Sequence, residues 1–180
     1  MSKLEQLINE LCPNGVECKA VEDVATITRG RVISKDYINN NQGNFPVYSS
    51  QTENNGELGY ISTYDFDGEY LTWTTDGANA GTVNFRAGKF YCTNVCGVLL
   101  SDKIETSKVI AEALNNVAKR YVSYVGNPKL MNNVMADIQI AVPTSKRERD
   151  QISSYLSYLD HLITLHLRKQ DKRKKGSKNT

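Results

Sequence analysis

Residues 145–172 carry the feature that most limits how this chain can fold, a run of mostly apolar side chains at alternating steps of four and three. The positions are Ile152, Leu156, Leu159, Ile163 and His166. This spacing is typical of the a and d positions of a coiled coil, and it predicts one long helix. A helix of about 28 residues is about 40 Å long, more than a small domain spans. We therefore expect these residues to form a dimer interface with another helix. Packing on the chain's own domain is the alternative.

Positive charge is concentrated near and beyond this helix, between Lys146 and Lys178, although the formal net charge of the chain is only +2. A charged run of this kind is usually a solvated face. Its functional interpretation is attraction to DNA phosphates through counterion release.

The remainder of the sequence predicts an α+β fold that is mostly β. Short apolar or β-branched runs between residues 16 and 100 are separated by Gly, Asn and Asp clusters, which is typical of strands and polar loops. Helical spacing occurs at residues 2–11 and 107–122, and residues 135–142 predict a last strand that Pro143 ends. We expect a domain at residues 1–143, a helix at 144–175 and a disordered tail at 176–180.

The cysteines and the absence of a long apolar run predict a cytoplasmic protein. The start of the chain is amphipathic and does not resemble a signal peptide, and no run approaches the about 20 apolar residues that span a bilayer. Cys12, Cys18, Cys92 and Cys96 are expected to be reduced and mostly buried. Cys92 and Cys96 are expected on one side of a single extended run.

The sequence offers no pattern for catalysis, metal binding or nucleotide binding. His161 and His166 do not share a helical face, and neither adjoins a nucleophile motif. The glycines at residues 74–83 lack phosphate-binding spacing, and Asn127-Pro128 lacks the rest of an amino-methyltransferase motif. We expect a non-catalytic chain without a metal or cofactor. An enzyme that uses Cys92 or Cys96 is a lesser alternative.

Polar loops supply side chains that can read base edges or bind phosphates. Asn and Gln can bond adenine, Arg and Lys favour guanine or phosphate, and hydroxyl groups bond phosphates. Solvated turns are the simpler explanation for such loops, and Trp73 is expected to be a core residue. The candidate DNA-binding residues are Arg29, Arg31, Lys35, Ser49, Ser50, Gln51, Thr52, Asn79 and Lys129.

Four segments, in order, resemble a specificity subunit of Type I restriction-modification systems. They are the Arg29-Gly30 step, FPVYSSQTENNGELGYISTYDFDGEYLTWTTDGANAGTV, GKFYCTNVCGVL and IQIAVPTSKRERDQISSYLSYLDHLI. The likeness runs along nearly the whole chain, with Thr144-Ser145-Lys146-Arg147 in place of a second proline and paired acids. Full-length members of this family resemble two tandem repeats, each with a target-recognition domain and a helix, and this chain is similar to one.

The resemblance implies sequence-specific recognition of double-stranded DNA. It implies that two copies pair through antiparallel helices and read a bipartite site. It also implies partner subunits: methyltransferase subunits that carry S-adenosylmethionine, and a restriction subunit for cleavage. The alternative is an assembly or regulatory protein that uses the helix without binding DNA.

Overall fold

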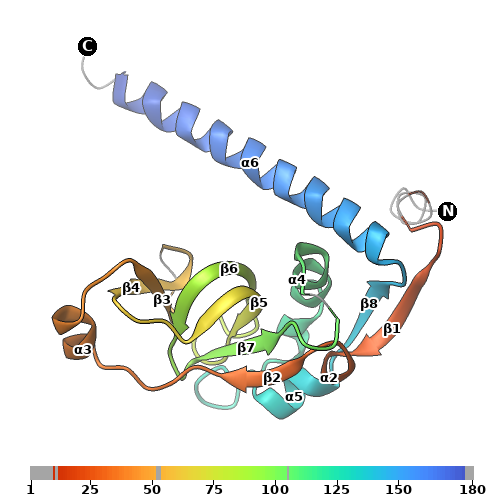
Figure 1. Cartoon of the computed structure of the whole chain (residues 1–180), viewed down its shortest axis with the longest axis horizontal. Helices are drawn as coiled ribbons and strands as arrows, with labels where there is room; N and C mark the ends of the chain where they lie inside the picture. Colours follow the sequence, from red (N-terminus) through yellow and green to blue (C-terminus); the bar gives the residue numbers. More distant parts are fainter. Residues whose placement is uncertain (1–9, 11, 52–53, 105, 177–180) are drawn as a thin grey trace. The chain divides into compact units, whose positions relative to one another are not determined.

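The computed structural model describes residues 10, 12–51, 54–104 and 106–176, with side chains of the long helix described as far as Gln170. The chain divides into two compact units. One is Val16–Val142, and the other combines Met1–Gly15 with Pro143–Thr180. The expected α+β fold with a long C-terminal helix is confirmed (Figure 1). The helix expected at residues 2–11 lies outside the described residues, apart from Glu10.

A six-stranded sheet forms most of the first unit, in the order β2-β7-β5-β6-β3-β4. Neighbouring strands are antiparallel except β3 and β6, which run parallel. A separate two-stranded sheet joins β1 and β8. The strands are β1 (Val16–Ala20), β2 (Thr26–Arg29), β3 (Phe45–Tyr48), β4 (Glu57–Ile61), β5 (Phe66–Thr74), β6 (Val83–Cys92), β7 (Cys96–Leu100) and β8 (Gln139–Pro143).

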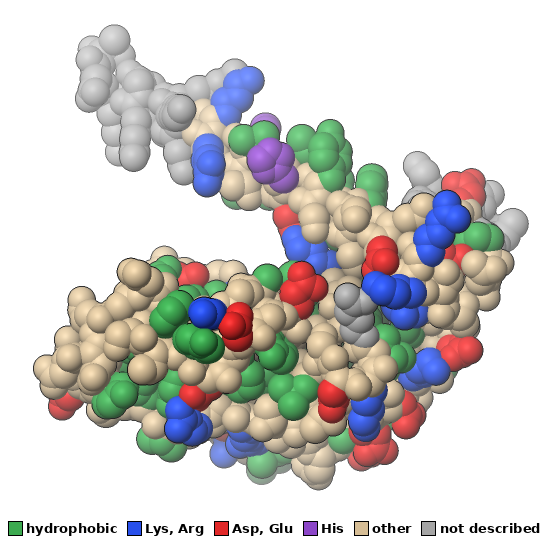
Figure 2. Space-filling view, viewed as in Figure 1, with side chains coloured by type: hydrophobic (Ala, Val, Ile, Leu, Met, Phe, Trp, Pro, Cys, Tyr) green, Lys and Arg blue, Asp and Glu red, His purple; other side chains and the backbone are tan. Residues whose placement is uncertain are grey.

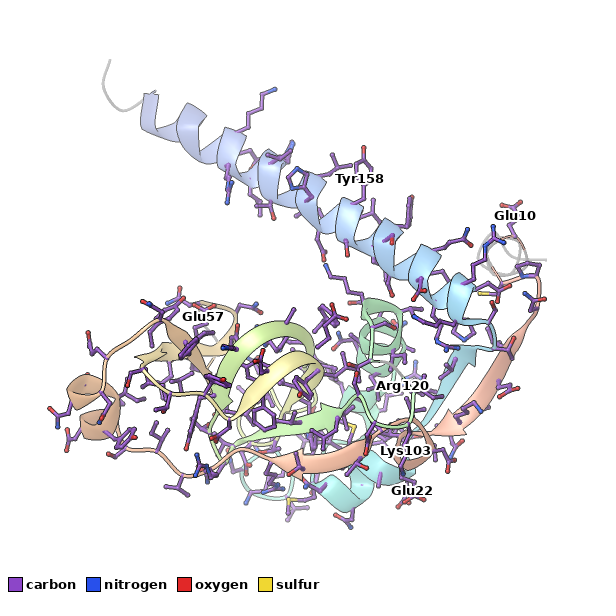
Figure 3. All side chains as sticks on the ribbon, in the orientation of Figure 1. Glu10, Glu22, Glu57, Lys103, Arg120 and Tyr158 are labelled. Carbon is purple, nitrogen blue, oxygen red and sulfur yellow. The ribbon has the colours of Figure 1, made fainter. Side chains whose placement is uncertain are left out.

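Short helices connect the strands. Ser34 caps α3, because its hydroxyl accepts a hydrogen bond from the Tyr37 amide at 3.0 Å. The Nζ atom of Lys103 donates to the carbonyl of Glu22, and this bond ties the residues after β7 to α2 (Figure 3). The helices are α2 (Val21–Val24), α3 (Lys35–Asn40), α4 (Lys108–Asn115) and α5 (Asn132–Asp137), with 3₁₀ turns η1 (Asn54–Gly56) and η2 (Ala118–Tyr121).

The main core lies around the Trp73 side chain, which is fully buried as predicted. Its indole Nε1 donates to the carbonyl of Leu130 at 3.2 Å. The ring lies so close to Gly97 that a Cβ atom there would be 2.2 Å from Cη2 of Trp73. Only glycine fits at this position of β7 without displacing the indole. The core therefore fixes both β7 and the segment around Leu130.

Two predicted elements differ from the structure. Residues 135–142 do not form one strand: α5 occupies Asn132–Asp137, and only Gln139–Pro143 is extended. The side chain of Met135 is buried on this helix, so its hydrophobicity reflects helix packing. The helix expected at residues 107–122 ends at Asn115, and a 3₁₀ turn follows.

The second unit contains α6 (Lys146–Gly176), the helix predicted by the coiled-coil spacing. Glu148 fixes its first turn, because one carboxylate oxygen accepts from both the backbone and the side-chain nitrogen of Asn14, at 3.1 and 2.8 Å. Arg149 donates to the carbonyls of Pro143 and Thr144. None of the helices in the described part of the chain has the length and apolar character needed to cross a membrane.

Candidate nucleic-acid interface

The ends of three strands meet at the turn formed by residues 93–95, between β6 and β7. The Thr93 amide donates to the Tyr48 carbonyl at the end of β3, at 2.9 Å. The Thr75 amide, just after β5, donates to the Val95 carbonyl at 3.2 Å. The Arg31 amide, just after β2, donates to the Cys92 carbonyl at 3.0 Å. Backbone hydrogen bonds therefore gather three of the predicted loops at one place.

Arg31 is exposed beside this turn, with its guanidinium held by an acidic side chain. Its Nε donates to Asp65 at 2.9 Å, and a second guanidinium nitrogen forms an ion pair with the same carboxylate. This hydrogen bond raises the pKa of Arg31. The guanidinium also lies 5.6 Å from the centre of the Tyr91 ring. Together with Ser34, Tyr37 and other residues, it lines a hollow of about 380 Å³.

Arg29 and Lys129 belong to segments that lie side by side. Both partners of the Arg29 guanidinium are uncharged: Asn132 Oδ1 at 2.7 Å and Met131 Sδ at 3.9 Å. Lys129 forms an ion pair with Asp76 at 3.4 Å. A carboxylate therefore offsets the electrostatic potential of Lys129, whereas the two uncharged partners of Arg29 do not offset that of Arg29.

The remaining candidates are more dispersed. Ser49, Ser50 and Gln51 are half-buried directly after β3, and the Ser49 amide donates to the Gly56 carbonyl at 2.9 Å. Thr52 lies outside the described residues. Lys35 is exposed at the first position of α3, and Asn79 lies in the turn between β5 and β6. Whether any of the nine side chains contacts DNA stays a prediction.

Sequence reasoning missed a buried arginine that anchors the loop after β3. Arg86 on β6 is only 4% exposed, and its guanidinium stacks 3.7 Å from the centre of the Tyr48 ring. It donates to the Asn55 carbonyl at 2.6 Å and to the Thr72 hydroxyl at 3.3 Å. Burial raises the pKa of Tyr48, and the nearby Arg86 opposes that rise. The sequence around Arg86 resembles that of an ordinary surface arginine on a strand. Only its contacts with distant residues, Tyr48 and Asn55, distinguish it.

The sequence predicts that Cys92 and Cys96 lie on one extended run, but the structure places them on two strands. They end β6 and begin β7, and their buried Sγ atoms are 2.9 Å apart across the turn. Burial raises the pKa of Cys92 well above its ordinary value, and the hydrogen bond with Cys96 adds to the rise. A thiol held protonated is a weak nucleophile, which disfavours an enzyme based on this pair. All four cysteines are free, and only Cys18 is exposed.

The predicted dimer residues follow one side of α6. Ile152, Leu156 and Leu159 are half-buried, and Ile163 is 58% exposed. His166 is exposed, and its ring nitrogen Nε2 shares a hydrogen bond with Gln170 at 2.8 Å. Pairing of this stripe with a second helix stays a prediction.

A second apolar stripe adjoins the first on α6. Tyr155, Tyr158, Leu162 and Leu165 recur at steps of three, four and three, and all four are exposed. Figure 2 shows hydrophobic side chains on the surface of this helix, and Figure 3 shows Tyr158 projecting from it. The helix therefore presents two neighbouring apolar stripes.

The described part of the chain contains no group of three or more His, Cys, Asp or Glu side chains placed to hold a metal ion.

Comparison with known proteins decides the family. The sequence pattern of the Type I restriction modification DNA specificity domain matches residues 13–173. This chain belongs to that family.

Two relatives in the family are proteins of Mycoplasma pneumoniae. An N-terminal type I specificity-subunit chain is 50% identical over 138 residues, which cover 76% of this chain and 73% of that one. The specificity subunit of the Type I restriction enzyme MpnII is 47% identical over 125 residues, which cover 68% of this chain and 38% of that protein. Both relatives are type I specificity subunits, so the expectation of a non-catalytic specificity component is confirmed.

Solved specificity subunits share the fold. The subunit from M. genitalium superimposes with a TM-score of 0.68 at 16% identity, over 81% of this chain and 39% of that one. The subunit from Thermoanaerobacter tengcongensis superimposes with a TM-score of 0.55 at 14% identity, over 92% of this chain and 45% of that one. The chain thus spans less than half the length of these specificity subunits.

Replacing Arg86 with Met should release the loop that Arg86 anchors. The variant loses the hydrogen bond to the Asn55 carbonyl and the cation held against Tyr48, while keeping much of the apolar volume. We expect hydrogen exchange of the Ser49 amide, measured by NMR, to become about 10- to 100-fold faster. Arg120→Met, at an exposed position, is the matched control and should leave this amide unchanged. Equal protection in Arg86→Met and the wild type would show that Arg86 does not hold the loop.

Proposed function

We propose that this chain recognises a specific sequence in double-stranded DNA as the specificity component of a Type I restriction-modification complex. The observation that carries the proposal is the convergence of the loops after β2, β3 and β5 on the turn at residues 93–95. This convergence places Arg31 and the start of the polar loop after β3 beside one turn, and Arg29, which ends β2, lies two residues before Arg31. Cations bind and position phosphates, and short polar side chains read base edges.

The proposed active form is a homodimer built by α6. Because one recognition domain reads one half-site, two copies are needed for a bipartite site, and twofold symmetry of the protein gives an inverted repeat in the DNA. The stripe Ile152, Leu156, Leu159, Ile163 and His166 forms the helix pair. The second stripe provides a surface for methyltransferase subunits, which would supply S-adenosylmethionine and the base chemistry. A restriction subunit joins them for cleavage.

Binding to duplex DNA should depend on salt and on Arg29. We expect the wild-type chain to bind a random-sequence duplex pool with an affinity that falls steeply as salt rises, because phosphate binding releases counterions. Arg29→Ala should weaken binding about 3- to 10-fold and reduce the slope of log K against log salt by about 0.9. Fluorescence anisotropy over a salt series measures both.

Lys19→Ala is the control for this measurement, since it also removes one cation but from β1, where Lys19 is paired with Glu17. Its binding should equal that of the wild type. A chain that shows no salt-dependent affinity for duplex DNA, yet binds methyltransferase subunits, would establish the assembly protein instead.

Leu159→Asp should dissociate the homodimer, because a carboxylate placed in an apolar seam loses its hydration without gaining a partner. Light scattering should give the wild-type protein about twice the 20.1 kDa mass of one chain, and it should give the variant the mass of one chain. Ser157→Asp adds the same charge on the opposite side of α6 and should remain dimeric. A wild-type chain that stays monomeric at tens of micromolar would contradict self-pairing.

A further inference from the structure

A small protruding hairpin at residues 123–129 lies next to the candidate interface and takes no part in the core. Two backbone hydrogen bonds between Ser123 and Lys129 close it, at 2.8 and 2.9 Å. Gly126 has a φ of +77°, which allows the tight turn at the tip. The hairpin is therefore a defined structure whose tip residues are held in position.

The base of this hairpin is attached to the end of β5. The Leu130 amide donates to the Thr75 carbonyl at 2.8 Å, and the Gly77 amide donates to the Pro128 carbonyl at 2.9 Å. Thr75 is also bonded to the turn at residues 93–95, where the predicted DNA-binding loops meet. The hairpin consequently lies at the same end of β5 as those loops.

The tip exposes two large apolar side chains to water. Tyr124 is 71% exposed and Val125 is 93% exposed. Neither contributes to the core that stabilises the fold, although burying an apolar side chain of this size is favourable. Exposed apolar residues at an ordered, protruding position are a feature of binding surfaces.

The charges around the hairpin identify its ligand class. Residues 123–129 contain one lysine and no acidic residue. Lys119 and Arg120 precede the hairpin on η2, and Arg29 lies against Met131 and Asn132 immediately after it. Asp76 is the ion-pair partner of Lys129. An apolar tip between cations suits a nucleic-acid groove, where apolar side chains meet sugars and bases while cations meet the phosphates on either side.

We propose that the hairpin at residues 123–129 inserts into a groove of the duplex, with Tyr124 and Val125 against sugars and base edges. This inference rests on the proposed DNA recognition and adds a contact element to it. A tip of two apolar side chains is small for a stable protein interface, which needs about 800 Å² on each partner.

Tyr124→Trp makes the contact measurable, because the chain has one tryptophan, Trp73, which is fully buried. The substitution places a second indole at the exposed tip, where acrylamide quenches its fluorescence. A saturating random-sequence duplex pool should reduce the acrylamide quenching constant by about half, since a base or sugar then covers the indole. Val16→Trp, at an exposed position on β1, is the matched control and should be quenched equally with and without DNA.

A second variant, Tyr124→Ser combined with Val125→Ser, measures the contribution of the tip to binding. We expect affinity for the same pool to fall about tenfold, with thermal unfolding unchanged because neither side chain packs in the core. Duplex binding by the wild type, together with an unchanged quenching constant or an unchanged affinity in this double variant, would overturn the inference. Failure of the wild type to bind any duplex would instead overturn the proposed function.

Discussion

The buried indole of Trp73 is the contact on which the arrangement of the candidate interface depends. Its ring fills the space that a side chain on Gly97 would need, and its Nε1 donates to the Leu130 carbonyl. The first contact fixes β7, which begins directly after the turn at residues 93–95. The second fixes the segment that carries Lys129 and the partners of Arg29. One core side chain therefore sets the positions of loops that are distant in the sequence.

Elements with a long local pattern could be predicted from the sequence, whereas short or long-range features could not. The periodicity over residues 145–172 predicted α6, because each turn of the helix repeats the same signal. The six-residue α5 is too short to show a period, so its apolar residues looked like part of the following strand. The sequence places Cys92 and Cys96 on one extended segment, because apolar residues continue on both sides of the three-residue turn that separates β6 from β7.

The same limit applies to the candidate site. Arg29, Arg31 and Lys129 could be selected as basic residues in predicted loops, but their partners come from other segments. Arg31 forms an ion pair with Asp65, whereas Arg29 contacts the uncharged side chains of Asn132 and Met131. Arg86 contacts Tyr48 and Asn55 only because β6 lies beside β3 in the folded sheet. No spacing in the sequence encodes that contact.

Selection of binding sites from a random-sequence duplex library, with the wild-type chain alone, tests most directly whether this half-length chain reads DNA as a symmetric pair. The account predicts enrichment of one motif made of two inverted half-sites at a fixed separation, because two recognition domains related by twofold symmetry bind together. Enrichment of a single half-site would contradict the paired form. A library that shows no enriched sequence, despite salt-dependent binding, would contradict sequence recognition by this chain.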